Sequence, residues 1–297
     1  MGRFDDHGQV ISYERFGDTK APAVILLMGL GMPQTCWPPR LIQNLVAEGF
    51  QVITMDNRDA GDSHHFTDQP VDQGDVLNGI MNAVIGRQVT QAKYTLSDMA
   101  LDAVRLLDHL SVDRAHFVGF SMGGMIAQVV ASQFQDRVAT LTSISSASGH
   151  VRTGLGKLTA IWSLVREPKQ DEAQEGYFRQ VAMKLAGPLY PPTEEELVFL
   201  VEAVKQMPFD RQAMYRQLLA ILASGDRSLA LHFITAPTLV IHGKSDPLLP
   251  FAAGEETMRC ISNATLWAID GLGHQLPSKL MNQFGQRIAQ HCHQHPA

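Results

Sequence analysis

Cysteines are scarce in this 297-residue sequence, and their arrangement indicates neither a disulfide framework nor a structural zinc site. The chain contains only Cys36, Cys260 and Cys292, an odd number of widely spaced residues without a CxxC pair. Such a set is typical of a reducing compartment. Motifs that would hold a cofactor are also missing, so we expect a protein that works without one.

Basic clusters and long apolar runs are absent as well. The net charge is −6, and acidic and basic residues are interspersed, so nucleic acid is not an expected partner. No apolar run approaches the roughly 18 residues of a membrane span; the run VILLMGLGM soon meets Pro33 and Gln34. The polar first ten residues lack the apolar stretch and cleavage site of a secretory leader. We therefore expect a cytoplasmic protein without an integral membrane segment; its oligomeric state stays open.

The first half of the sequence alternates apolar runs with amphipathic stretches. Three continuous apolar runs predict central strands buried on both faces. These runs are residues 23–29, 51–56 and 115–120. A more alternating run at 9–17 predicts a more exposed strand, and two amphipathic stretches, 39–50 and 94–112, predict helices. Thr95 is a candidate N-cap for the second helix. This pattern predicts a mostly parallel sheet flanked by helices.

Strand signals continue at 138–145 and then vanish until 236–243. The gap is helical in pattern, and it includes the capping box formed by Thr193 and Glu196. Beyond it the sequence predicts a helix, a strand and a last helix. These elements are residues 251–261, 265–270 and 277–292. We therefore expect a core domain made of residues 1–145 and 233–297, and a helical cap inserted at 146–232.

Two regions leave their roles open at this stage. The excursion from His64 to Lys93 is polar and rich in turn residues, and it fits either a functional lid or a plain insertion. Large apolar residues of the cap region are candidates for pocket lining or for core. These are Trp162, Tyr177, Phe178, Met207, Phe209 and Met214.

The sequence Gly119-Phe-Ser121-Met-Gly123 matches the nucleophile motif G-x-S-x-G. It follows the apolar run 115–120 and precedes a helical pattern that begins at Met122. In this context the glycines permit a sharp strand-to-helix turn that presents the serine hydroxyl above the sheet. The alternative is a glycine-rich turn that merely starts a helix. The agreement of strand, helix and partner residues favours Ser121 as a nucleophile.

A serine hydroxyl needs a base to remove its proton, and the base needs an acid to orient it. Asp246 and His274 each follow a predicted strand, in the order acid then histidine that this architecture requires. Taken singly, Asp246 also fits an Asx-turn before Pro247, and His274 fits a surface loop. Together with Ser121 they predict a catalytic triad. Asp270, which ends a strand, is interpreted as a turn residue.

The loop Met28–Gly31 follows the first central strand, where this architecture places a second amide donor for the oxyanion. We expect the backbone amides of Leu30 and Met122 to form the oxyanion hole, although a plain turn also explains the glycines. The histidines at 291, 293 and 295 surround Cys292 and are interpreted as a frayed terminus rather than a metal site. His64 and His65 are interpreted as loop residues, and a place in the lining of the site stays open as the less favoured alternative.

Together these residues resemble the α/β-hydrolase superfamily over positions 9 to 290. The motifs most resemble small bacterial esterases of the aclacinomycin methylesterase type. The segments concerned are MGLGMPQTCW, DNRDAGDS, GFSMGG and the late Asp and His. Two residues depart from the family: Met28 replaces a common histidine, and Asp59 replaces a glycine of the D-x-R-G-x-G-x-S turn. The family uses this turn mainly for structure, so Asp56, Arg58 and Ser63 are not placed in the site.

The chemistry and the resemblance imply a serine hydrolase that forms an acyl-enzyme on Ser121 and acts on a small to medium, apolar carboxylic ester. Haloalkane dehalogenase and epoxide hydrolase chemistry would need an aspartate at position 121. Carbon–carbon bond hydrolysis, cyanohydrin cleavage, thioesters, lactones and amides remain alternatives, because the fold does not separate them. A non-catalytic receptor is a further alternative.

Overall fold

The computed structural model describes residues 2–6, 8–68, 70–90, 92–166, 174–205 and 210–297. A single eight-stranded sheet forms the centre of these residues, in the order β1-β2-β4-β3-β5-β6-β7-β8. Strand β1 pairs with β2, and β2 with β4, in antiparallel orientation. All pairs from β4 to β8 along this order are parallel. The predicted mostly parallel sheet is confirmed.

The strands lie close to the predicted runs. Their bounds are β1 Gly2–Asp6, β2 Gln9–Phe16, β3 Ala23–Leu27, β4 Gln51–Met55, β5 Ala115–Phe120, β6 Val138–Ile144, β7 Thr238–Gly243 and β8 Ala264–Ile269. Strand β1 was not predicted, because its sequence GRFDD has Phe4 as its one large apolar residue and shows no strand pattern. It is held by antiparallel pairing with β2 at the edge of the sheet.

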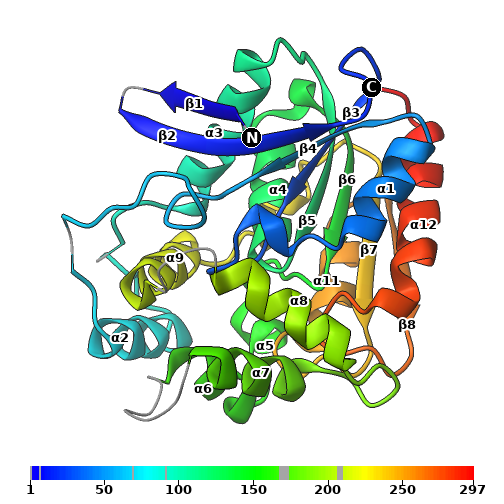
Figure 1. Cartoon of the computed structure of the whole chain (residues 1–297). Coiled ribbons are helices and arrows are strands. Elements are labelled where there is room, and N and C mark those ends of the chain that lie inside the picture. Colours follow the sequence, from blue (N-terminus) through cyan, green and yellow to red (C-terminus); the bar gives the residue numbers. More distant parts are fainter. Residues whose placement is uncertain (1, 7, 69, 91, 167–173, 206–209) are drawn as a thin grey trace.

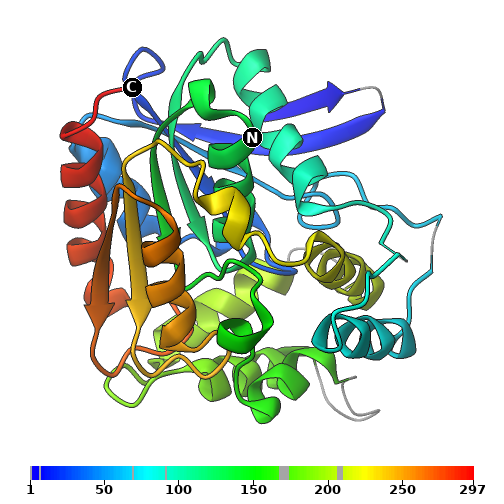
Figure 2. The ribbon, with the colours of Figure 1, turned by 180° about the vertical axis from the view of Figure 1, so that it is seen from behind.

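Helices cover both faces of the sheet (Figures 1 and 2). On one face α1 (Pro39–Ala47) lies beside α12 (Met281–His293). The other face carries α3 (Leu96–His109), α4 (Met122–Gln133) and α11 (Phe251–Cys260). Because successive side chains of a strand point to opposite faces of the sheet, each central strand contributes apolar side chains to both layers. The predicted helices are thereby confirmed, and they enclose the sheet in two apolar layers.

Six further helices lie between β6 and β7 in the part of the chain that the structure describes. They are α5 Val151–Gly154, α6 Leu158–Val165, α7 Gln174–Leu185, α8 Glu194–Lys205, α9 Arg211–Ser224 and α10 Ser228–Leu231. In Figure 2 the orange arrows of β7 and β8 point toward most of them. The helical character predicted for this region is confirmed, whereas its separation as a cap domain stays a prediction.

The excursion after β4 contains a helix, α2 (Gln73–Val84), that starts with a capping box between Asp72 and Asp75. In Figure 1 it lies beside α9, below the sheet. The frayed terminus expected around Cys292 is wrong: α12 continues to His293, and Cys292 is buried in the apolar layer beside α1. Among the helices described, none is both long and apolar enough to cross a membrane.

Candidate active site

Ser121 stands at the sharp turn between β5 and α4. Its φ of 56° lies in the left-handed region, which a non-glycine residue adopts only at a cost. Its amide donates to the carbonyl of Ile144 at 2.9 Å, which anchors the turn to β6. A Cβ on Gly119 would run into the carbonyl of Gly123, and one on Gly123 would run into the carbonyl of Leu27. The two glycines therefore allow the backbone packing that holds the serine in place.

The structure brings the three predicted triad residues together. The Ser121 hydroxyl lies 2.9 Å from Nε2 of His274, and Nδ1 of His274 lies 2.7 Å from Oδ2 of Asp246. When Nδ1–H donates to the carboxylate, Nε2 is left as an acceptor for the serine hydroxyl. All three residues are buried. This arrangement can move a proton from the hydroxyl to the imidazole.

The Asp246 carboxylate is held by its own loop. Its Oδ1 accepts hydrogen bonds from the amides of Leu248 and Leu249 at 2.8 and 2.9 Å. The rival acid Asp270 forms an ion pair with Lys244 at 2.8 Å on the surface, so it does not serve the histidine. Backbone donors leave Oδ2 free for His274 and fix the direction in which the carboxylate points.

His242 is a neighbour that sequence reasoning missed. It is buried at the end of β7, where Nε2 donates to the carbonyl of Leu249 at 2.9 Å, and it lies 3.7 Å from Asp246. Burial lowers the pKa of His242 despite the nearby Asp246, and this favours the neutral ring. The residue therefore ties the loop that carries Asp246 to the sheet. Its only signal in the sequence is a histidine inside an otherwise apolar run.

The expected oxyanion loop lies next to Ser121. A Cβ on Gly29 would lie 3.3 Å from Cβ of Ser121, so the backbone passes close to the nucleophile. Met122 is the first residue of α4, and amides at this position have no acceptor within the helix. The assignment of the Leu30 and Met122 amides to an oxyanion hole stays a prediction, and the closeness of this loop to Ser121 is in line with it.

Side chains from elsewhere hold this loop, and sequence reasoning missed them. The amide of Gly31 donates to Oε1 of Gln217 at 2.6 Å, and Nε2 of Gln217 donates to the carbonyl of Arg58 at 2.7 Å. Asn57 donates to the carbonyl of Met28 at 3.0 Å. Gln217 belongs to α9, more than 180 residues from Gly31, so no local pattern relates the two.

The turn after β4 is structural, as the resemblance implies. Asp56 accepts from the amides of Gln34 and Asp62 at 2.6 and 3.0 Å, and Arg58 pairs with Asp102 at 2.6 Å.

Asp59, which stands where the family commonly has a glycine, forms an ion pair with Arg216 of α9. The guanidinium of Arg216 contacts both carboxylate oxygens at 2.9 and 2.7 Å.

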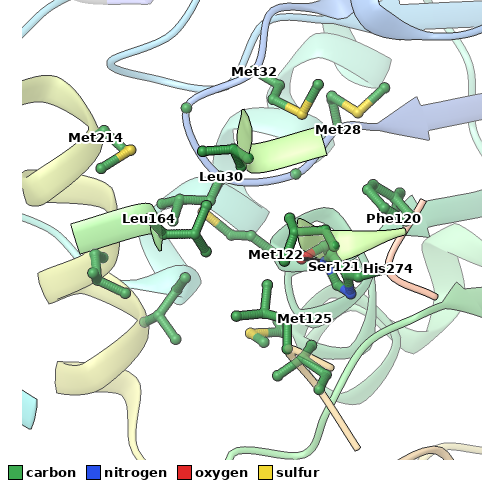
Figure 3. A pocket seen from close by; sticks show the side chains of 18 of the residues that line it. Met28, Leu30, Met32, Phe120, Ser121, Met122, Met125, Leu164, Met214 and His274 are labelled. Atoms are coloured by element: carbon green, nitrogen blue, oxygen red, sulfur yellow. Dashed lines mark hydrogen bonds between the residues drawn. The ribbon is translucent and has the colours of Figure 1, made fainter. Parts of the chain in front are cut away.

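A cavity of about 1250 Å³ opens over Ser121 and His274. Figure 3 shows its apolar lining, with Met28 and Met125 on the side of the serine and Met214 on the opposite side. The cap-region candidates divide: Tyr177, Phe178 and Met214 line the cavity, and Trp162 lies outside the lining and is half exposed. Met207 and Phe209 lie outside the described residues.

Two remaining histidine predictions can be compared with the structure. His65 lies at the cavity, with Nδ1 3.7 Å from Asp210, so the structure supports the alternative that this loop residue lines the site. His64 packs edge-on against Phe66. Among the described residues, no group of three or more His, Cys, Asp or Glu is arranged to hold a metal ion.

The chain is similar in sequence to known hydrolases. A family model described as alpha/beta hydrolase fold matches residues 22–277. Rhodomycin D methylesterase DnrP of Streptomyces peucetius is 26% identical over 94% of this chain and 93% of its own. The predicted resemblance to methylesterases of this type is thereby confirmed.

Solved structures share the fold. An enol-lactonase from Burkholderia xenovorans LB400 superposes with a TM-score of 0.74 at 21% identity, covering 98% of this chain and 100% of its own. The meta-cleavage product hydrolase CumD from Pseudomonas fluorescens IP01 reaches 0.74 at 20% identity, covering 97% and 95%. The predicted fold class is confirmed.

Proposed function

We propose that this chain, which belongs to the α/β-hydrolase family, hydrolyses carboxylic esters through an acyl-enzyme intermediate on Ser121. The observation that carries the proposal is the continuous hydrogen-bond chain from Ser121 through His274 to Asp246 at the floor of an apolar cavity. The methylesterase relative supports ester bonds as the substrate class.

The reaction has two steps in which His274 carries the proton. In the first, the Ser121 oxygen attacks the ester carbonyl, His274 takes the hydroxyl proton, and the amides of Leu30 and Met122 hold the anionic oxygen. His274 then donates the proton to the leaving alcohol, and the acyl group stays on Ser121. In the second step, His274 activates a water that releases the acid and restores the serine. Asp246 stabilises the imidazolium that forms in both steps.

Labelling with a fluorophosphonate tests the nucleophile. The probe should label the wild-type protein and fail to label Ser121→Ala. Ser132→Ala is the matched control, because Ser132 lies on the same helix and, among the described residues, its hydroxyl donates its one hydrogen bond to the carbonyl of Val129 at 3.0 Å. Wild-type protein that is folded and yet unlabelled would refute the proposal.

Hydrolysis of p-nitrophenyl esters tests the reaction. We expect Ser121→Ala and His274→Ala to lower kcat/KM by about 10³-fold or more, and Asp246→Asn by roughly 10³- to 10⁴-fold. Labelling of Ser121 without turnover of any ester would reject the ester substrate, and it would favour carbon–carbon bond hydrolysis by the same triad.

A further inference from the structure

We infer that α2, the helix of the excursion after β4, is a specificity element: with α6 and α9 it forms an apolar arm of the cavity that receives an extended acyl chain. This inference rests on the proposed ester hydrolysis at Ser121. Each of the three helices contributes apolar side chains to the cavity wall. Representative ones are Ile80, Ala83, Ile161, Leu164, Met214 and Leu218.

The walls of the arm are joined to one another. Gln73 at the start of α2 donates to the carbonyl of Val165 at 3.0 Å, and Tyr215 of α9 donates to the same carbonyl at 2.9 Å. Helices α2 and α9 approach closely at Gly79, where an added Cβ would lie 3.0 Å from Leu219. These contacts give the arm a defined shape, so it can discriminate between chains of different length.

The arm begins at the oxyanion loop. Leu30 packs against the apolar cluster that α2, α6 and α9 share, and a Cβ on Gly31 would lie 3.1 Å from Cγ of Met214. In Figure 3, Ser121 and His274 lie on one side of the cavity, and Leu164 and Met214 lie on the other. An acyl group attached to Ser121 can therefore pass Leu30 and enter the arm.

The position of His274 decides which part of the ester lies in the arm. Because His274 donates its proton to the leaving alcohol, the alcohol must lie on the histidine side of Ser121. The acyl group then points the opposite way, toward Leu164 and Met214. The arm is thus assigned to the acyl chain and not to the alcohol.

The chemistry of the wall defines the class of acyl group. The six side chains named above are aliphatic or thioether groups, so each methylene that they remove from water favours binding by roughly fourfold at full burial. Val84 of α2 lines the cavity and is also 47% exposed, so the arm reaches the surface there. We expect kcat/KM to rise with acyl length and then level off once the chain extends beyond the arm.

A chain-length series tests the assignment. The ratio of kcat/KM for p-nitrophenyl decanoate to that for the acetate is measured in the wild type, Ala83→Trp and Asn78→Trp. Ala83 lines the arm, whereas Asn78 is exposed on the same helix and lies outside the lining. The wild-type ratio should be about tenfold or more, Ala83→Trp should lower it at least about tenfold, and Asn78→Trp should leave it unchanged.

A second substitution, on α9, keeps the test valid if Ala83→Trp fails to fold. Leu218→Trp fills the arm from α9 and should lower the same ratio. The inference is overturned if the wild-type ratio is flat, or if neither block lowers it in protein that melts cooperatively. It is also overturned if the blocks act on acetate esters of long alcohols instead of long acyl esters. In each case fluorophosphonate labelling of Ser121 would show that the proposed nucleophile still stands.

Discussion

Replacing Asp59 by asparagine tests how α9 is attached to the core. The carboxylate accepts two hydrogen bonds from Arg216, one from the hydroxyl of Tyr94 at 2.7 Å and one from the amide of Phe66 at 3.0 Å. The side chains of Arg216 and Asp59 are 1% and 0% exposed. Asparagine tolerates the left-handed backbone of this position, where φ is 61°, so the substitution changes charge without adding strain.

The expected loss of stability follows from the charge that remains. Arginine stays protonated in proteins, so Arg216 keeps a buried charge after its main partner is neutralised. Breaking a buried pair in this way costs about 3–5 kcal/mol. Asp210, whose carboxylate lies 3.3 Å from Arg216 and is 30% exposed, offsets part of this cost. We therefore expect a loss of about 3 kcal/mol, a large part of the about 5–15 kcal/mol that stabilises a typical protein.

Urea unfolding followed by circular dichroism measures the loss. Asp270→Asn is the matched control, because its ion pair with Lys244 is exposed, at 79% and 47%, and should contribute less than about 1 kcal/mol. Adding Arg216→Met to Asp59→Asn removes the buried charge that has lost its main partner and should restore more than half of the loss. If Asp59→Asn costs no more than Asp270→Asn, the buried pair does not hold α9 as argued.

Two further predictions follow from single buried side chains. Gln217→Met should lower kcat for ester hydrolysis by about 10- to 100-fold with little change in KM, because Gly31 loses the acceptor that positions the oxyanion loop. Gln212→Met is its control on the same helix, because Gln212 is exposed and lies outside the cavity lining. Equal kcat values for the two variants would count against this role. Burial lowers the pKa of His116 from 6.5 to about 4, so between these values the unfolded state binds a proton that the folded state does not. The free energy of unfolding should therefore be unaffected by His116 above pH 6.5 and should fall as the pH is lowered toward 4. The contribution is up to about 3 kcal/mol; His116→Leu should flatten the unfolding free energy over that interval, and an unchanged slope in urea titrations would contradict it.

Local patterns in the sequence were enough to predict the central strands and the helices that cover them. The runs that became β3, β4 and β5 are mostly apolar and buried along their whole length. Such runs are typical of strands that are covered on both faces. Strand β1 and helix α2 lack a comparable signal. The polar segment of β1 depends on pairing with β2, and α2 depends on packing against α9.

The candidate triad was predictable because each member follows a strand of one parallel sheet. The carboxyl ends of such strands meet at the same edge, so Ser121, Asp246 and His274 converge although 153 residues separate the first from the last. The motif around Ser121 supplied the starting point. Catalysis by these residues stays a prediction that labelling and kinetics will test.

By itself, then, the sequence determined the fold class and the three side chains that meet above the sheet, because both follow from periodicity and from order along the chain. The tertiary structure decided what surrounds them. Gln217 reaches the oxyanion loop, Arg216 meets Asp59, and α2 closes one wall of the cavity through contacts between segments far apart in the chain. Such contacts depend on how the helices pack on one another. A local pattern in one segment of sequence does not predict them, because their partners lie in distant segments.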